Sequence, residues 1–338
     1  MKTSLKELSK KSGYSMNTVS RALRDADDVK QATKALIQHL AQEMGYIPNS
    51  VAKNLRLGKT NTIGVASADS SNPYFAEVIL GIEDAARSHN YHILLINTEE
   101  SYKGEREAID IFIERQVDGL LIIPMFGEHN NVEHLKALNV PFLLVGRWLP
   151  GLEDHAVLTD EFEKAKEVTS LFLSNGHRNI LHLAGPSFVS SSIDRIEGYR
   201  AAYRDAGIPV NEDLIVATDG HTEDGLHQIN AIIRKELPFT ALFAFNDLVA
   251  IGALRALKEA GYRVPRDIEV IGFDDLDMSR YLYQSLSSVR IPKQQLGRIA
   301  FETLLEHMTD ASAAYVKKTI ESRLMLRETT TFEYSSDS

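Results

Sequence analysis

The spacing of apolar residues along the chain changes once, near residue 60. Before that point apolar positions recur every three or four residues, as they do on one face of a helix. After it, short continuous apolar runs alternate with helix-like stretches. This pattern predicts a small all-helical domain followed by a larger α/β body.

Two short helices are predicted at the start of the chain. Ser4 and Glu7 have the spacing of a capping box, and Gly13 suits the end of the first helix. Ser15 can cap a second helix over about residues 16–23. A glycine-containing turn between two short helices is the helix-turn-helix layout, in which the second helix enters the DNA major groove.

A third helix is predicted over about residues 30–44. Its buried face is expected to carry Ala32, Leu36, Leu40 and Met44, which are spaced four residues apart. A three-helix domain with no role on DNA would show the same periodicity, so the pattern alone leaves both interpretations open.

Two polar side chains on the second helix have the chemistry of base readers. The amide of Asn17 can pair with adenine, and the guanidinium of Arg21 can bind guanine or phosphate. The charge distribution agrees, because residues 1–60 carry a net charge of +6 and the remainder −16. A basic head on an acidic body suits a polyanion at one end only.

The body contains two similar series of predicted strands and helices, which indicate parallel sheets covered on both faces. Ligands of such open sheets bind beyond the carboxyl ends of the strands, so two facing sheets suggest a cleft. The first series has strands at 62–66, 92–96, 119–123 and 141–145 and helices near 75–89, 104–116 and 130–138. The second has strands at 179–184, 214–217, 239–244 and 268–273 and helices near 192–206, 223–236 and 247–260.

Composition and missing motifs narrow the function. The 338 residues include no cysteine, no long apolar run and no signal-like N-terminus, so we expect a cytoplasmic protein without a membrane span. The sequence has no phosphate-loop, dinucleotide-binding, nucleophile-elbow or His-Glu-x-x-His pattern. We therefore expect no enzymatic activity, no metal site and no cofactor.

The head resembles the LacI/GalR family of bacterial repressors, on residues 15–23 (SMNTVSRAL) and 45–49 (GYIPN). Residues 48–56 (PNSVAKNLR) resemble the hinge helix of that family. The resemblance implies that two hinge helices, one per subunit, enter the minor groove, where Leu55 wedges into a base step. The predicted DNA-binding residues are Ser15, Met16, Asn17, Thr18, Ser20, Arg21, Asn49, Ala52, Lys53, Leu55 and Arg56.

The body, residues 61–330, resembles the periplasmic-binding-protein-like core of the same family, with marker phrases at 71–75 (SNPYF), 245–247 (FND) and 270–275 (VIGFDD). The resemblance implies two doubly wound parallel-sheet subdomains, with chain crossings near Asp160, Arg290 and Lys318. The predicted domains are a DNA-binding head at 1–47, a hinge and linker at 48–60, an N-subdomain at 61–160 plus 291–318, a C-subdomain at 161–290 plus 319–330, and a polar tail at 331–338.

The resemblance also assigns residues to an effector cleft. Arg195 stands three residues before Gly198, where the family has an effector-binding arginine, and Asp274 and Asn246 end strand-like runs. The match at His221 is weak, because the local length is one residue short. The predicted effector-binding residues are Tyr74, Phe75, Met125, Arg147, Ser191, Arg195, His221, Asn246 and Asp274.

One departure from the family bears on the effector. Relatives often have Asp-Arg where this chain has Gly146-Arg147, so the pocket loses an acceptor and keeps a donor. Two arginines in one pocket suggest an anionic effector, such as a sugar phosphate or an acid sugar.

Together these features predict a homodimeric transcription regulator, most simply a repressor. It would bind a near-palindromic double-stranded DNA operator and respond to a small-molecule effector, with a carbohydrate as the first candidate. A purine- or other metabolite-responsive regulator of the same architecture is an alternative. A sugar-binding protein without DNA activity is another, but it would be expected to have a signal peptide and no basic head.

Overall fold

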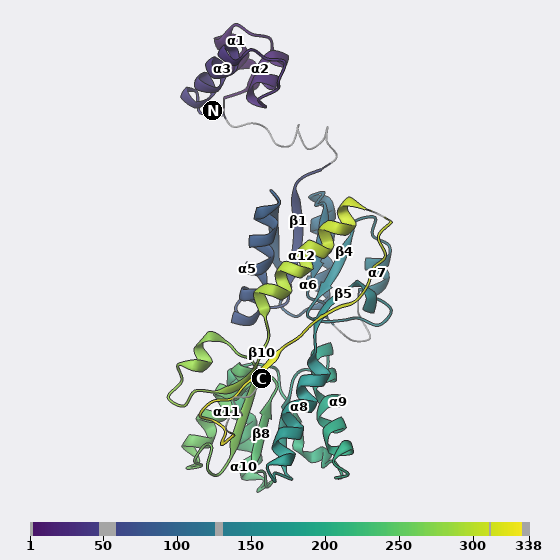
Figure 1. Cartoon of the computed structure of the whole chain (residues 1–338), viewed down its shortest axis with the longest axis vertical. Helices are drawn as coiled ribbons and strands as arrows, with labels where there is room; N and C mark the ends of the chain where they lie inside the picture. Colours follow the sequence, from purple (N-terminus) through teal and green to yellow (C-terminus); the bar gives the residue numbers. More distant parts are fainter. Residues whose placement is uncertain (1–2, 47–58, 126–130, 311, 333–338) are drawn as a thin grey trace, which may run out of the picture. The chain divides into compact units, whose positions relative to one another are not determined.

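The computed structural model describes residues 3–46, 59–125, 131–310 and 312–332. The chain divides into two compact units, Met1–Thr60 and Asn61–Ser338. The first is a helical head and the second is an α/β body (Figure 1). The sheets of the body are predominantly parallel, as the sequence predicts.

The head contains three helices, α1 (Leu5–Ser12), α2 (Met16–Leu23) and α3 (Gln31–Glu43). The predicted capping box at the start of α1 is present, and Gly13 ends that helix in the left-handed conformation with φ 76°. Ser15 caps α2 by accepting a hydrogen bond from the backbone N–H of Thr18. The buried core of the head consists of Leu8, Val19, Ala22, Ile37 and Ala41.

The predicted apolar face of α3 is right at Leu40 and Met44, which pack against the core of the head, and wrong at Ala32 and Leu36, which are exposed. The buried side chains of the helix are those of Lys34, Ile37 and Ala41. Lys34 can replace an apolar residue because its methylene stem packs while its ammonium group reaches Asp25, 2.8 Å away. Because Lys34 is charged, the apolar pattern of the sequence did not mark its position as part of the buried face of α3.

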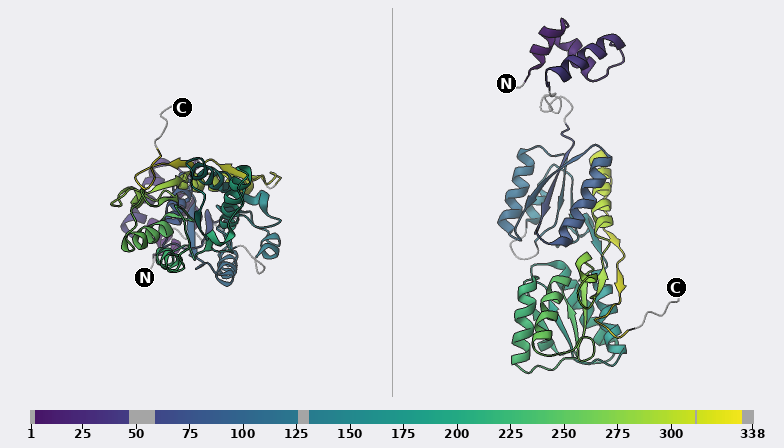
Figure 2. Two further views of the ribbon diagram at one scale, coloured as in Figure 1. Left: turned by 90° about the horizontal axis from the view of Figure 1, so that it is seen from below. Right: turned by 90° about the vertical axis from the view of Figure 1, so that its left-hand side faces the viewer.

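The first lobe of the body contains a six-stranded parallel sheet in the order β11-β5-β4-β3-β1-β2. Its helices lie on both faces of the sheet (Figure 2). The strands are β1 (Thr62–Ser67), β2 (His92–Asn97), β3 (Gly119–Ile122), β4 (Phe142–Val145), β5 (Ala156–Thr159) and β11 (Lys318–Ile320), and the helices are α5 (Pro73–Ser88), α6 (Tyr102–Glu114), α7 (Val132–Lys136) and α12 (Lys293–Thr309).

The second lobe repeats this arrangement in the order β12-β10-β9-β8-β6-β7, with β12 antiparallel to β10. Three 3-10 turns, η1 (Glu153–His155), η2 (Glu212–Leu214) and η3 (Asp277–Arg280), lie in loops of the two lobes. The strands are β6 (Ile180–Ala184), β7 (Ile215–Ala217), β8 (Ala241–Ala244), β9 (Glu269–Asp274), β10 (Ser287–Arg290) and β12 (Arg323–Met325), and the helices are α8 (Glu161–Ser174), α9 (Ser190–Asp205), α10 (Thr222–Arg234) and α11 (Asp247–Glu259).

The chain passes between the two lobes at three places. It leaves the first sheet after β5, returns between β10 and α12, and leaves again between β11 and β12. Thr319 and Ile320 still pair with β5, so the first lobe extends two residues beyond the predicted limit at Lys318. The backbone N–H of Ser322 donates to the Asp160 carboxylate at 2.9 Å, which ties two of these crossings together.

Close helix packing joins segments that are distant in sequence. Figure 1 shows α12 beside α5, although about 200 residues separate them. A Cβ atom on Gly81 of α5 would overlap the carbonyl of Gln294 on α12, and one on Gly252 of α11 would overlap the carbonyl of Thr222 on α10. Glycine at these positions lets the helix backbones touch.

Candidate functional site

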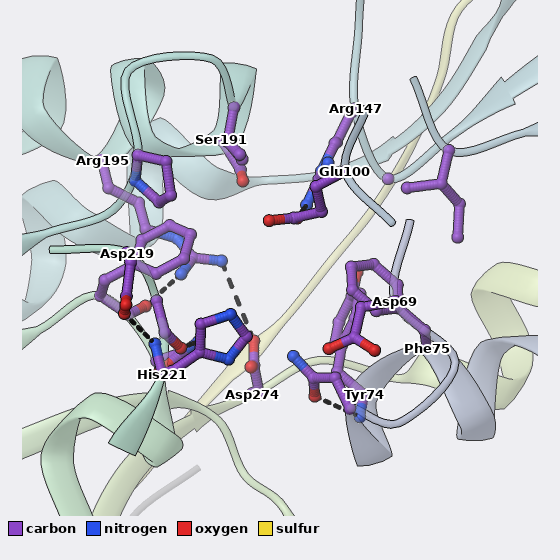
Figure 3. Close-up of a pocket in the computed structure, with 18 of the residues that line it drawn as sticks. Asp69, Tyr74, Phe75, Glu100, Arg147, Ser191, Arg195, Asp219, His221 and Asp274 are labelled. Atoms are coloured by element: carbon purple, nitrogen blue, oxygen red, sulfur yellow. Dashed lines mark hydrogen bonds and ion pairs between the residues drawn. The ribbon is translucent and has the colours of Figure 1, made fainter. Parts of the chain in front are cut away.

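A pocket lies between the two lobes, beyond the carboxyl ends of strands from both sheets (Figure 3). It holds about 640 Å³ of space not filled by protein atoms, part of it open to solvent. Its lining from the first lobe consists of Asp69, Asn72, Tyr74, Phe75, Glu100, Ile123, Val145, Gly146 and Arg147. Its lining from the second lobe consists of Glu161, Pro186, Val189, Ser191, Arg195, Asp219, Gly220, His221, Phe245, Asn246 and Asp274.

Eight of the nine predicted effector residues line this pocket, and Met125 does not. The side chain of Met125 is buried, and its backbone N–H donates to the Glu105 carboxylate at 2.8 Å. Glu105 also accepts a hydrogen bond from the side chain of Asn131 at 2.8 Å. This buried contact fixes the chain after β3 within the first lobe, which explains why Met125 lies outside the lining.

The aromatic wall of the pocket is built at the N-terminus of α5. Asn72 caps the helix by accepting a hydrogen bond from the backbone N–H of Tyr74, and Pro73 is its first residue. The rings of Tyr74 and Phe75 make an edge-to-face contact, with centroids 5.1 Å apart. Burial raises the pKa of Tyr74, and the carboxyl groups of Glu161 and Asp274 raise it further, so its hydroxyl stays protonated.

Arg147, at the end of β4, is engaged within the first lobe. Its Nη2 lies 3.0 Å from the Glu100 carboxylate, and its Nη1 donates to the Pro124 carbonyl at 3.4 Å. The guanidinium also lies 5.4 Å from the centre of the Phe75 ring. Its charge is therefore compensated by the protein.

Arg195, on the first turns of α9, is the centre of a buried charge network. Its Nε lies 2.7 Å from the Glu161 carboxylate, and its Nη2 lies 3.9 Å from that of Asp274. The guanidinium stacks on Phe273, 3.6 Å from the ring centre, and also faces Phe245. Burial raises the pKa of Asp274 well above its usual range, and Arg195 opposes that rise.

Two predicted polar residues of the second lobe, Asn246 and Ser191, differ in whether their side chains already have hydrogen-bond partners within the protein. Asn246 is occupied, since it caps α11 and donates to the Gly220 carbonyl at 2.9 Å. Ser191 is 8% exposed, and among the described residues its hydroxyl has no hydrogen-bond partner. Its hydroxyl is thus available to a bound molecule.

Sequence reasoning identified Asp274 but missed the other four carboxylates of the pocket. Asp69, Glu100, Glu161 and Asp219 each follow a strand by two or three residues. Because ligands of open parallel sheets bind at that edge, the three that follow predicted strands, Asp69, Glu100 and Asp219, carried a usable signal, whereas Glu161 follows β5, which was not predicted.

Contacts across the lobes close one side of the cleft. The backbone N–H of Trp148 donates to the hydroxyl of Ser190, and its indole N–H donates to the Asp194 carboxylate, both at 2.9 Å. Burial raises the pKa of Asp194, and the Trp148 hydrogen bond opposes that rise. On the side of α12, Lys293 Nζ donates to the backbone carbonyl of Asp274 at 2.7 Å.

The head places the predicted base-reading residues at the start of α2. Met16 and Asn17 are exposed, and Thr18 hydrogen-bonds to Ser15. Arg21 forms an ion pair with Asp28. Ser20 is half-buried on the same helix. The predicted hinge residues Asn49, Ala52, Lys53, Leu55 and Arg56 lie outside the described residues, so their roles stay predictions.

Two protein-family descriptions match separate parts of the chain. Residues 4–49 match the bacterial regulatory proteins of the lacI family, and residues 60–327 match the periplasmic binding proteins and sugar binding domain of the LacI family. The chain belongs to the LacI family. The family and fold class predicted from the sequence are thereby confirmed.

Named relatives of this LacI-family chain are similar over nearly their whole length. It is 31% identical over 319 residues to the transcriptional repressor PurR of Actinobacillus pleuropneumoniae, which is 94% of each chain. It is 31% identical to the repressor CytR of Escherichia coli, over 96% of each. A ribose operon repressor of Haemophilus influenzae is 29% identical, over 96% of this chain and 97% of the relative.

Solved structures of LacI-family regulators have the same fold. The transcriptional regulator CelR in complex with cellobiose is 26% identical, with a TM-score of 0.74 over 97% of this chain and all of that one. The Lac repressor bound to ONPG in the repressed state is 25% identical, with a TM-score of 0.89 over 98% of this chain and all of that one. Across the described ranges, no helix is both long and apolar enough to cross a membrane.

Proposed function

We propose that this LacI-family protein is a transcriptional repressor whose operator affinity is controlled by a sugar or sugar derivative bound between the lobes. The observation that carries the proposal is the pocket, because both lobes contribute side chains to it at the carboxyl ends of their strands. A molecule held by both lobes stabilises one angle between them, which is how a ligand shifts a conformational equilibrium.

A carbohydrate suits the lining. Tyr74, Phe75 and Phe245 offer apolar faces to the C–H groups of a sugar ring, and the hydroxyl of Ser191 can hydrogen-bond to a sugar hydroxyl. The CelR relative is described in complex with cellobiose, and another relative is named for the ribose operon. These names support the choice of a carbohydrate.

A purine or nucleoside effector is the second candidate. Relatives named PurR and CytR are as similar to this chain as any named here, and the same aromatic rings can stack on a base. A sugar-binding protein without DNA activity is disfavoured, because residues 4–49 match the regulatory head of the family.

We infer the remaining assignments from family membership. The protein acts in the cytoplasm as a homodimer on a near-palindromic operator, without enzymatic activity, since its named relatives are repressors. A change in the angle between the lobes would be transmitted to the DNA-binding head through residues 48–60. A coupling free energy of about 1–3 kcal/mol suffices to change operator affinity roughly 5–150-fold.

The proposed contact between Asn17 and a base is tested with Asn17→Ala. Binding affinity is measured for an operator selected from random duplexes and for its single-base variants. We expect a loss of about 1–3 kcal/mol on the selected operator and relaxed specificity at one base position. Thr33→Ala, on α3, is the matched control in the head. An equal loss on every sequence would assign Asn17 to phosphate contact instead.

The pocket is tested with a thermal-shift screen of sugars, nucleosides and nucleobases, since a molecule that binds only the folded form raises the melting temperature. The molecule that binds is then titrated into Ser191→Ala. We expect affinity to fall roughly fivefold, the effect of one lost hydrogen bond, with unfolding unchanged. Unaltered affinity would place the effector elsewhere.

A further inference from the structure

The charge of the pocket is the opposite of what its two arginines suggest. Its lining contains five carboxyl groups and two guanidinium groups. With Asp274 counted as neutral, because burial raises its pKa, four carboxylates still face two guanidinium groups. Both guanidiniums are engaged inside the protein, by Glu100 for Arg147 and by Glu161 and Asp274 for Arg195. Neither is available as a free cation for a phosphate or carboxylate.

Two carboxylates remain without a cation, one on each lobe. Asp69 follows β1 in the first lobe, and its Oδ1 accepts hydrogen bonds from the backbone N–H and hydroxyl of Ser71, at 2.9 and 2.7 Å. Asp219 follows β7 in the second lobe, and its Oδ1 accepts from the backbone N–H of His221 at 2.8 Å. Among the described residues neither forms an ion pair, and both line the pocket (Figure 3).

From this arrangement we propose that the effector carries a protonated amine on a polyhydroxylated skeleton, and that this amine pairs with the carboxylate of Asp69 or of Asp219. The proposal rests on the proposed function, that this pocket holds the effector. A bound cation would offset the excess of negative charge that carboxylates from both lobes give the cleft.

The hydroxyl groups of the effector have a separate partner. Ser191 is more than nine-tenths buried, faces the pocket and has no hydrogen-bond partner among the described residues. Its Oγ atom is reachable from the pocket, so it can hydrogen-bond to a hydroxyl of a bound molecule. Ser191 therefore indicates a polar ligand, independently of the carboxylates.

The chemical class follows from the two observations. An ammonium group pairs with Asp69 or Asp219, and a hydroxyl pairs with Ser191, so an amino sugar or an aminated nucleoside fits. A phosphorylated or carboxylated sugar would bring negative charge into a pocket that already has an excess of it. The anionic effector expected from the sequence is replaced by a cationic one.

The test compares matched ligands by calorimetric titration at low salt. Each skeleton of the panel, such as glucose, is used in its neutral, aminated and 6-phosphorylated forms. We expect the aminated form to bind about tenfold or more tightly than the neutral one, as for a charge-assisted hydrogen bond, and the phosphorylated form to bind weakest. Tightest binding of a neutral or phosphorylated form overturns the proposal.

Variants distinguish failure of the amine proposal from failure of the proposed effector site. Asp69→Asn and Asp219→Asn keep the oxygen that their own loops use, so the double variant should fold and should lose the preference for the aminated form. Asp213→Asn, which removes a charge from an exposed residue outside the lining, should keep it. A preference that persists in the double variant overturns the proposal, while a loss of affinity in Ser191→Ala still supports the pocket.

Discussion

Individual buried side chains link the stability of the body to pH, and His182 is the clearest case. It lies in the middle of β6, stacked between Tyr199 and Phe243 with ring centroids 5.5 and 4.6 Å away. Its Nδ1 lies 3.0 Å from the Phe243 carbonyl oxygen, a contact that places a proton on Nδ1. Burial lowers the pKa of His182 to about 4.

The His182 ring predicts acid sensitivity between pH 7 and pH 5. The unfolded chain takes up a proton near pH 6.5 and the folded chain only near pH 4, so stability is lost as pH falls through that window. His182→Phe should lack this loss of stability, because phenylalanine does not titrate. Urea unfolding should show that the parent protein loses about 2 kcal/mol more than the variant between the two pH values.

The comparison isolates His182 from other titrating groups. Burial raises the pKa of Asp247 to about 6, so that carboxyl stabilises the fold as pH falls from about 6 toward 4, the opposite direction. Asp247 is present in both proteins and its effect cancels in the difference. Equal losses in parent and variant would mean that His182 is protonated in the folded state.

At the scale of elements, helix pairs depend on glycine contacts. Gly252 on α11 touches α10 so closely that an added Cβ atom would overlap the Thr222 carbonyl. Gly252→Ala should destabilise the body by about 1–3 kcal/mol, because the cost of forcing the helices apart exceeds the gain of about 1 kcal/mol in helix propensity.

The matched control for Gly252→Ala is Arg255→Ala, on an exposed position of the same helix. It should change the free energy of unfolding by less than about 0.5 kcal/mol. Chemical denaturation measures both variants. A Gly252→Ala protein as stable as the parent would show that α10 and α11 can separate at no cost.

Burial explains which elements the sequence predicts. The strands with continuous apolar runs, such as β1, β3 and β8, are found within about two residues because parallel strands are buried on both faces. The sequence reading did not identify β10, whose Ser288 hydrogen-bonds to Asp247 at 2.5 Å, so a polar residue fills a core position. The short strands β5, β11 and β12 and the long helices α8 and α12 were also missed.

Sequence prediction of the pocket is limited in a similar way. Local motifs identified Arg147 and Arg195, but the partners that compensate their charges come from Glu100 and Glu161, 47 and 34 residues away. Such pairings depend on the order of strands in the sheet, which local periodicity does not contain. The sequence therefore shows the two arginines of the pocket without the carboxylates that compensate them.

At the scale of the whole body, Trp148 reports on the contact between the lobes. It is the only tryptophan in the chain, and its indole N–H donates across the cleft to Asp194. Asp194→Ala removes the acceptor, so the indole should become more hydrated and its fluorescence emission should shift to longer wavelength. The same side chain should report effector binding whenever the lobe angle changes.

The control for Asp194→Ala is Glu197→Ala, which removes an exposed carboxylate of α9 that forms an ion pair with Arg200 on the same helix. Its emission spectrum should match that of the parent protein, since surface ion pairs contribute little. Unchanged emission in Asp194→Ala would mean that the indole environment does not depend on this cross-lobe bond.

The three chain crossings between the lobes have a consequence for the diversity of effectors. Because three chain segments connect the lobes, we expect different effectors to act through the same quantity, the angle between the lobes. Effectors of different chemical structure can therefore produce the same angle between the lobes. Under the proposed mechanism, side chains of the cleft can be exchanged for those that suit a new molecule without changes to the residues that contact DNA.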